Sequence, residues 1–344
     1  MQDLGTISII TPSFNRGDII HETAQSIFNQ TYPYWEWVIV DDGSTDNSWE
    51  IINEYAAKDP RVKVYKRDRD PKGACVCRNI AIERSTGSYL IFLDSDDVLA
   101  SFCLEQRIKA AHQYPEVDFI MFSMLMFKKR PDDLALLWNI DKGNDDIDGL
   151  LFGDAICQGT GTIWKKRSFV DIGMWDEHLL LWQDVELHLR ALIGGVKYRK
   201  QLQLKPDVFI RISDVSISRT GYHSLPKLKS RISVLKSITE RMVAKGLLTK
   251  YRKGIRKMCI DLFVNAGSIN NIDIVQELFG FSEKHNLFSR QEERKLKRFS
   301  TIRKYRLYKI PKLNSFCIKE IQKIELTPGD QTLGTLAYKE PIQL

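Results

Sequence analysis

The sequence predicts an α/β protein built on a mostly parallel β-sheet of the Rossmann-like kind. Over about the first hundred residues, short apolar or β-branched runs alternate with amphipathic stretches in the order β-α-β-α-β-α-β. Strands that alternate with helices form a parallel sheet that helices cover on both faces. The run from Tyr89 to Leu93 is apolar or aromatic throughout, as expected of a strand buried on both sides.

The individual elements follow from residue type and spacing. β-Branched and aromatic residues favour strands, and apolar residues on one stripe favour helices. Strands are expected at 7–12, 35–40, 62–65, 89–93 and 119–124, and helices at 19–29, 46–56 and 74–84. The aspartate-rich stretch 128–148 is expected to be a mobile surface loop. Gly159-Thr-Gly161 then leads into a further strand, and its glycines suit the close approach of a ligand.

Composition places the chain among ordinary globular proteins, with 43% hydrophobic and 28% charged residues. No apolar run reaches the roughly 18 residues that a membrane-spanning helix needs. The stretch Met1-Gln-Asp-Leu-Gly5 lacks the basic-then-apolar layout of a signal peptide. The six cysteines form no C-x-x-C pair, so buried free thiols are expected. These features together predict a cytoplasmic protein.

Charge divides the chain into two parts. Residues 1–225 carry 26 Lys and Arg against 33 Asp and Glu, whereas residues 226–344 carry 25 against 11, so the net charges are −7 and +14. A domain boundary is therefore expected near Leu225-Pro226, followed by a basic, mostly helical region over 226–344. Its basic amphipathic segments suit an anionic membrane surface, or helix faces packed on the first domain; nucleic acid fits less well.

Polar residues follow three of the predicted strands. In doubly wound sheets ligands bind beyond the carboxyl ends of the strands, so 12–16, Asp41-Asp42 and 94–97 are expected along one rim. Carboxylates as close as Asp94, Asp96 and Asp97 repel one another unless a cation lies among them, and oxygen ligands suit Mg²⁺ or Mn²⁺. The alternative is an acidic turn that caps the next helix. The motifs G-x-G-x-x-G and G-x-x-x-x-G-K-[ST] are absent, which argues against an NAD-type fold and a P-loop NTPase.

Four motifs in this order resemble the family 2 glycosyltransferases of the GT-A fold. They are Thr11-Pro-Ser-Phe-Asn15-Arg16, the run 38–46, Arg78-Asn79 and the run 92–97, and the resemblance extends over about residues 5–220. It implies a GT-A catalytic domain over 1–225 and an inverting, metal-dependent enzyme. Such an enzyme moves a sugar from a nucleotide-diphosphate sugar, with a UDP-sugar favoured, to a saccharide or lipid-linked saccharide in surface polysaccharide biosynthesis. Work on a lipid-linked acceptor would place it peripherally at the inner face of the membrane.

The resemblance also implies roles on the donor side. The expected donor-binding residues are Thr11, Pro12, Asn15, Arg16, Asp41, Asp42, Lys72, Arg78, Asp94 and Ser95. Asp96 is the expected direct ligand of Mn²⁺ or Mg²⁺, and Asp97 a helix cap or supporting group. His223 is a candidate second metal ligand, but a lone histidine is more often structural. Arg78 could instead form a structural ion pair with the acidic loops, and Asp42-Gly43 also fits a tight turn.

On the acceptor side, Leu181-Trp182-Gln183-Asp184-Val-Glu186 is similar to the family's Glu-Asp segment, which opens a helix near the acceptor. The resemblance implies that Asp184 is the general base and that Trp182 and Gln183 contact the acceptor. Gln183 departs from the usual acidic pair, and this makes Glu186 a rival base. Residues two apart on a helix point to different faces, which argues against the rival. Trp182 could also be ordinary core.

Two other functions fit parts of the same pattern. A sugar-nucleotide-binding protein without activity could serve as a scaffold and recruit partners through its basic region. A nucleotidyltransferase would bind similar donors, but a glycine-rich basic loop after the first strand is absent. Because Asp94, Asp96 and Asp184 occur together, the sequence favours the transferase.

Overall fold

The computed structural model describes residues 2–134, 136–212 and 220–310, together with 312, 313, 315 and 324. Its centre is a seven-stranded sheet in the order β10-β6-β9-β4-β1-β2-β3. These strands are β1 (Ile7–Ser13), β2 (Trp35–Asp41), β3 (Val62–Lys66), β4 (Tyr89–Phe92), β6 (Phe119–Phe122), β9 (Thr162–Lys165) and β10 (Tyr198–Gln201). Neighbours are parallel except where β9 pairs with β4 and β6. The predicted mostly parallel α/β sheet is confirmed.

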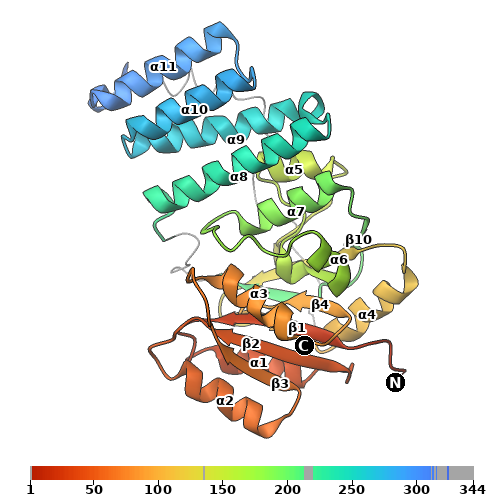
Figure 1. Cartoon of the computed structure of the whole chain (residues 1–344). Helices are drawn as coiled ribbons and strands as arrows, with labels where there is room; N and C mark the ends of the chain where they lie inside the picture. The colour runs from red at the N-terminus through yellow and green to blue at the C-terminus, as the bar shows by residue number, and fades with distance from the viewer. Residues whose placement is uncertain are drawn as a thin grey trace.

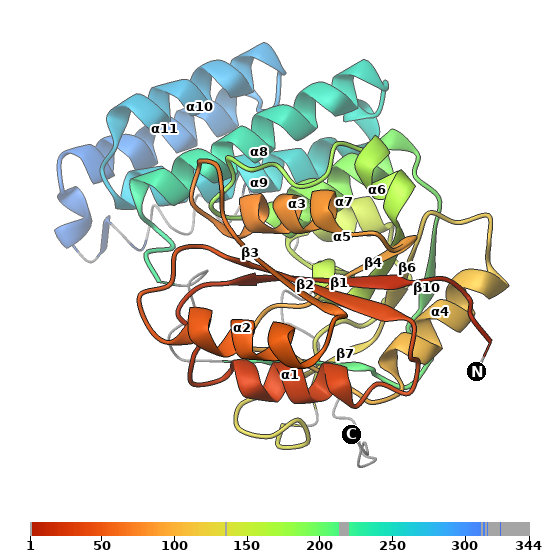
Figure 2. The ribbon, with the colours of Figure 1, turned by 60° about the horizontal axis from the view of Figure 1, so that its bottom comes forward.

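Helices cover both faces of this sheet, as expected for strands that are apolar on both sides (Figure 2). Along β1, Ile7 and Ile9 belong to one core cluster and Ile10 to the other. The first face carries α1 (Ile20–Phe28), α2 (Ser48–Lys58) and α4 (Cys103–Gln113). The second carries α3 (Ala74–Arg84), α6 (Lys166–Asp171) and α7 (Gln183–Gly194). The elements predicted before residue 100 all form within a few residues of their expected limits.

A second, four-stranded sheet was not predicted. Its order is β5-β11-β7-β8, with β5 (Val98–Leu99), β11 (Val208–Arg211), β7 (Met124–Phe127) and β8 (Leu136–Leu137). The single strand expected at 119–124 divides at Ser123, because β6 joins the large sheet and β7 the small one. The expected plain loop at 128–148 is also wrong. It contains β8 and the start of α5 (Asp146–Phe152), which Asp145 caps by accepting bonds from two backbone N–H groups.

The C-terminal region is helical through residue 304 and packs on the first part of the chain (Figure 1). It comprises α8 (Leu225–Ala244), α9 (Leu248–Ser268), α10 (Ile272–Lys284), α11 (Arg290–Lys304) and the 3₁₀ turn η2 (Leu307–Lys309). One apolar cluster joins Leu150 of α5 and Leu189 of α7 with Leu235 of α8 and Phe263 of α9. A continuous core thus crosses the predicted boundary near Leu225. The rest of the predicted basic region lies almost entirely outside the described residues.

Two expectations from composition concern the whole chain. Within the described ranges, no helix is both long and apolar enough to cross a bilayer. Cys75, Cys77, Cys103, Cys157 and Cys259 are buried free thiols, as expected, and Cys317 lies outside the described residues.

Candidate active site

The parallel register brings the carboxyl ends of β1, β2 and β4 together at one edge of the large sheet. Ser13 at the end of β1 lies opposite Asp41 at the end of β2. On the other side of β1, the Leu93 N–H donates to the carbonyl oxygen of Ile10 (3.0 Å), so that Asp94 follows directly at the same edge. This edge is the predicted rim.

The first two predicted donor-binding residues lie inside the sheet. The Thr11 hydroxyl accepts a hydrogen bond from the indole Nε1 of Trp37 (2.9 Å), and Thr11 is completely buried. Pro12 is partly buried and has no N–H to donate. Their contribution to donor binding stays a prediction, and what the structure gives them is a role in holding the end of β1.

Beyond β1, the chain turns and is hydrogen-bonded to the loop before α2 and to its first residue. Asn15 has a φ of 50°, and its Oδ1 accepts from the Thr45 N–H (2.8 Å). The Arg16 N–H donates to Ser48 Oγ (2.7 Å), so the backbone at Arg16 is fixed. Its guanidinium donates through Nη1 to the Asn15 carbonyl oxygen (3.2 Å) and points at the acidic loop, where Nη2 lies 3.5 Å from Asp96 Oδ2. A cation therefore faces the predicted metal ligand.

Asp41 and Asp42 at the end of β2 shape the following turn. Asp41 Oδ2 accepts from the N–H groups of Gly43 and Ser44, each at 2.9 Å, and Gly43 has a φ of 81°. The turn interpretation therefore holds, while the predicted binding of the sugar donor by Asp41 stays a prediction. Asp42 Oδ1 forms an ion pair with Nε of Arg67 (2.7 Å). Arg67 was missed in the sequence, although it directly follows β3 at the same rim.

Arg78 on α3 connects the donor and acceptor sides of the site. Its Nη2 lies 2.6 Å from Asp94 Oδ1, and its Nη1 donates to Gln183 Oε1 at 3.4 Å. Burial alone would lower the pKa of Arg78, but Asp94, Cys75 and Asp184 together outweigh burial and raise this pKa. Arg78 is thus a permanent cation between the two halves. Where the family usually has an acidic residue, this chain has Gln183, and its side-chain oxygen accepts a hydrogen bond from Arg78.

The acidic loop leaves the Asp96 side chain partly exposed, in a setting that favours cation binding. Ser95 before it is buried, whereas the Asp96 side chain is 27% exposed. Burial and the adjacent Asp94 raise the pKa of Asp96, and Arg16 opposes this effect. A carboxylate that is costly to ionise among like charges gains from a bound cation.

Asp97 does not cap a helix. The next helix, α4, begins only at Cys103, and Asp97 Oδ1 instead accepts from the backbone N–H of Arg211 on β11 (2.9 Å). The Arg211 side chain donates through Nε to the carbonyl oxygen of Asp96 (3.0 Å). Arg211 therefore fixes the acidic loop from the small sheet. The sequence signal for it is an apolar run that ends in a charge, the same signal that marked Asp94.

The carboxylates of the acidic loop suit a divalent cation that is also bound by water and by substrate phosphates. In the part of the chain that the structure describes, no three His, Cys, Asp or Glu side chains form a closed metal cage. Mg²⁺ and Mn²⁺ are commonly bound by one or two carboxylates, with water and substrate phosphates completing the shell. His223 is engaged through Nδ1 with Asn265 Oδ1 of α9. Its role as a second ligand stays a prediction.

Asp184 lies in the first turn of α7, where its carboxylate is held by one backbone donor. The Gly159 N–H donates to Asp184 Oδ1 at 2.7 Å, from the 3₁₀ turn η1 (Gly159–Gly161). The rival Glu186 is buried and forms a two-point ion pair with Arg190 (2.8 and 2.9 Å). Of the two carboxylates, only Asp184 keeps an oxygen without a donor among the residues that the structure describes, so the geometry favours Asp184.

Trp182 and Lys72, which are predicted to contact the substrates, lie at the edges of the site. Trp182 precedes α7 with a φ of 63° and packs partly buried against the C-terminal helices, with the Arg231 guanidinium 5.6 Å from its ring. Lys72 is exposed, and its Nζ lies 3.7 Å from the centre of the Phe14 ring. Both side chains could turn toward a ligand, and their substrate contacts stay predictions.

Comparisons with known proteins identify the family of the chain. The family described as Glycosyl transferase family 2 matches residues 8–173. The UDP-Glc:alpha-D-GlcNAc-diphosphoundecaprenol beta-1,3-glucosyltransferase WfaP of Escherichia coli is 38% identical over 242 residues, which cover 67% of this chain and 86% of WfaP. The putative teichuronic acid biosynthesis glycosyltransferase TuaG of Bacillus subtilis is 43% identical over 103 residues, but the match spans only 40% of TuaG.

The fold has a solved counterpart. The crystal structure of S. aureus TarS 1-349 in complex with UDP-GlcNAc superposes with a TM-score of 0.59 at 16% sequence identity, covering 83% of this chain and 93% of that one. At this identity the likeness concerns the fold alone. With the GT-A-type sheet and the match to WfaP over most of its length, the chain belongs to glycosyl transferase family 2.

Proposed function

We propose that this chain is an inverting, metal-dependent glycosyltransferase of surface polysaccharide biosynthesis that uses a UDP-sugar donor and a lipid-linked saccharide acceptor. The observation that carries the proposal is the link through Arg78, which bonds Asp94 on the donor side and Gln183 next to Asp184 on the acceptor side. Support for the substrates comes from WfaP, whose name specifies UDP-glucose and a diphosphoundecaprenol-linked GlcNAc.

The donor side gathers positive charge where a diphosphate would lie. Arg16 points at Asp96, and Lys72 is exposed beside Phe14 on the same edge. Asp96, with Asp94 close by, would hold Mn²⁺ or Mg²⁺, which when bound neutralises the charge of the departing diphosphate. Arg16 can bind a phosphate oxygen by turning from its 3.5 Å contact with Asp96, because that contact is long and the two side chains are 25% and 27% exposed.

The acceptor side supplies the base. Asp184 accepts the proton of the attacking hydroxyl through its second oxygen, while the Gly159 N–H holds the first. A base and a leaving group on opposite sides of the anomeric carbon give direct displacement, and hence inversion. Trp182 offers an aromatic face to the acceptor sugar, and Gln183 an amide group. Arg78 holds the donor side and the acceptor side in a fixed relative position, because it is hydrogen-bonded to Asp94 on one and to Gln183 on the other.

The basic C-terminal helices would bring the enzyme to a lipid-linked acceptor. Residues 290–309 contain nine Lys and Arg against two Glu. Large apolar side chains lie exposed among or just beyond these cations, with Tyr305 63% and Ile310 53% exposed. Basic residues with exposed apolar side chains suit the surface of an anionic membrane. Peripheral association is therefore part of the proposal.

Separating donor binding from transfer tests the base assignment. Asp184→Asn should leave UDP-sugar affinity unchanged and lower transfer by about 10²–10⁴-fold, the usual contribution of a general base. Calorimetry with UDP-, GDP- and dTDP-sugars plus Mn²⁺ first identifies the donor, and transfer is then followed on a lipid-linked saccharide. Asp96→Ala should instead abolish the metal-dependent part of donor binding.

The matched control is Glu186→Gln, which changes the rival carboxylate on the same helix. Full transfer by Asp184→Asn would overturn the base assignment, and loss of transfer in Glu186→Gln would then point to Glu186. Tight donor binding without transfer by the unmodified protein, over a panel of saccharide acceptors, would support the scaffold function instead.

A further inference from the structure

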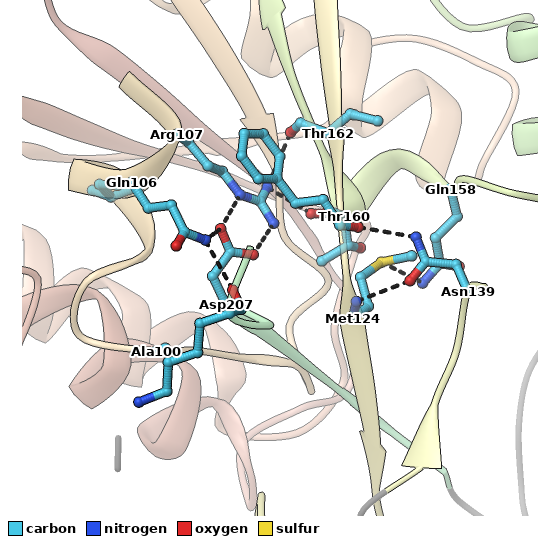
Figure 3. A network of polar contacts seen from close by, with 12 residues as sticks. Ala100, Gln106, Arg107, Met124, Asn139, Gln158, Thr160, Thr162 and Asp207 are labelled. Atoms are coloured by element: carbon cyan, nitrogen blue, oxygen red, sulfur yellow. Dashed lines mark hydrogen bonds and ion pairs between the residues drawn. The ribbon is translucent and has the colours of Figure 1, made fainter. Parts of the chain in front are cut away.

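A completely buried ion pair lies behind the turn η1 and has no part in the chemistry described so far (Figure 3). Arg107 of α4 binds Asp207 at two points, Nε to Oδ2 at 2.9 Å and Nη2 to Oδ1 at 2.7 Å. Both side chains are 0% exposed. A buried ion pair is often no more stabilising than an apolar pair of similar size, because both charges lose their hydration. Stability alone therefore does not explain this pair.

The third donor group of Arg107 holds the backbone of the turn. Nη1 donates to the carbonyl oxygens of Thr160 (2.8 Å) and Thr162 (3.1 Å), as Figure 3 shows. Within the turn, Thr162 Oγ1 donates to the Gly159 carbonyl oxygen (2.8 Å). The flat guanidinium has five N–H donors in fixed directions, so it can bind a carboxylate on one side and carbonyls on the other. A lysine could not make both sets of bonds.

The turn has little freedom to move in other directions. A Cβ on Gly161 would lie 2.5 Å from Met124 Sδ, and a Cβ on Gly159 would lie 3.2 Å from the Trp175 ring. Met124 is itself held at both ends, because its N–H donates to Asn139 Oδ1 (3.0 Å) and its Sδ accepts from Gln158 Nε2 (3.9 Å). Packing on one side and Arg107 on the other thus fix where the Gly159 N–H points.

That N–H is the donor that holds the Asp184 carboxylate at 2.7 Å. We propose that Arg107, anchored by Asp207, is a positioning residue for Asp184, acting through the backbone of Gly159–Thr162. The inference rests on the proposed function in one respect, that Asp184 is the base. Without the guanidinium, two buried carbonyl oxygens lose their donor, and the turn rearranges to find others. The Gly159 N–H then leaves Asp184, whose orientation toward the acceptor is lost.

The test is a double-mutant cycle between Arg107→Lys and Asp184→Asn. A displacement of about 1 Å in a reacting group can lower the rate by about 10²-fold. Arg107→Lys should accordingly lower kcat by about 10- to 100-fold, with the KM of the UDP-sugar unchanged. In the Asp184→Asn background the same change should have no further effect, because groups that act through one another are not additive. Unspecific damage to the fold would lower kcat in both backgrounds.

A milder variant covers the case in which Arg107→Lys does not fold. Thr162→Val keeps the shape of a buried side chain and removes only the bond to the Gly159 carbonyl. It should lower kcat in the same non-additive way. The matched control is Glu36→Gln, which disturbs a buried charged network at the opposite edge of the sheet and should leave kcat unchanged.

The outcomes separate this inference from the proposed function. If Asp184→Asn transfers sugar normally, the base assignment fails, and the positioning role fails with it. If Asp184→Asn is impaired but Arg107→Lys or, where that variant is unfolded, Thr162→Val has normal kcat, only the positioning role is overturned. The same holds if these variants lower kcat by equal factors in both backgrounds.

Discussion

At the scale of single residues, each carboxylate of the candidate site is defined by the donor that it meets. A carboxylate with both oxygens occupied is held in place, and one with a free oxygen can take a proton or a cation. Glu186 is of the first kind, since both of its oxygens bind Arg190. Asp184 and Asp96 are of the second kind, with one protein donor each. This difference, and not the residue type, separates the proposed base and metal ligand from structural acids.

Glu36 shows how strongly such donors act away from the site. Burial alone would raise the pKa of Glu36, but hydrogen bonds from Lys63, Ser8, Thr86 and Gly87 outweigh it and lower this pKa to about 2 from 4.5. A depressed carboxyl pKa means that the folded state is favoured by ionisation, so the stabilisation is complete above pH 4.5 and is lost as the pH falls toward 2.

We therefore expect Glu36→Gln to lower the free energy of unfolding by about 3 kcal/mol at pH 7, since one pKa unit corresponds to about 1.4 kcal/mol. Urea unfolding of both proteins at several pH values checks this. The difference between them should shrink between about pH 5 and pH 2. The exposed Glu116→Gln is the control, and a difference for Glu36→Gln that is independent of pH would contradict the account.

The sequence located the acids of the site better than their partners. Asp41, Asp42 and Asp94 could be placed because each follows a strand of the parallel sheet, and the position of its rim follows from topology. The roles of Arg107 and Arg211 could not be predicted, because each acts on a partner about a hundred residues away in the chain, Arg107 on Asp207 and Arg211 on the carbonyl oxygen of Asp96. No local pattern in the sequence records such a pairing.

At the scale of elements, the turn η1 is where packing and chemistry meet. Gly161→Ala would place a Cβ 2.5 Å from Met124 Sδ and 2.7 Å from its Cε, in a buried setting. Overpacking of this kind costs about 1–3 kcal/mol. Because the Gly159 N–H lies in the same turn, we expect Gly161→Ala to lower both the melting temperature and kcat.

Two glycines provide controls for this prediction, which thermal unfolding and transfer assays check. Gly87→Ala makes an equally close contact, 2.6 Å to the Thr6 carbonyl oxygen, at the opposite edge of the sheet. It should lower the melting temperature with normal kcat in the folded protein. Gly194→Ala in α7 meets nothing within 4 Å and should be neutral or slightly stabilising. Normal kcat in Gly161→Ala would show that the turn tolerates displacement.

At the scale of the whole molecule, the C-terminal helices fill one of the roles that the sequence left open, and the proposed membrane contact would be a second. Their apolar faces pack on α5 and α7 in one core, which is the packing alternative. Packing accounts for the buried side chains and leaves many cations of the described helices exposed, among them Arg290, Arg294 and Lys304 on α11. The sequence could not choose between these roles, because one amphipathic helix can pack with its apolar face and still present its cations to a membrane.

Vesicle binding tests whether the exposed cations of the C-terminal helices bind an anionic membrane. Arg294, Lys297 and Arg298 lie exposed on α11, and a cation near an anionic membrane contributes about 1 kcal/mol. Changing all three to Gln should therefore weaken binding to phosphatidylglycerol–phosphatidylcholine vesicles by up to about 3 kcal/mol, measured by sedimentation at physiological salt.

The matched control removes three exposed cations elsewhere, at 128–130 beyond β7, and should bind vesicles like the unmodified protein. Binding should also fall with added salt, because screening shortens the range of the attraction. Equal losses in both triple variants would mean that net charge acts without a defined surface. No binding of the unmodified protein to anionic vesicles would leave core packing as the sole role of these helices, and the enzyme would then have to reach a lipid-linked acceptor through its sugar alone.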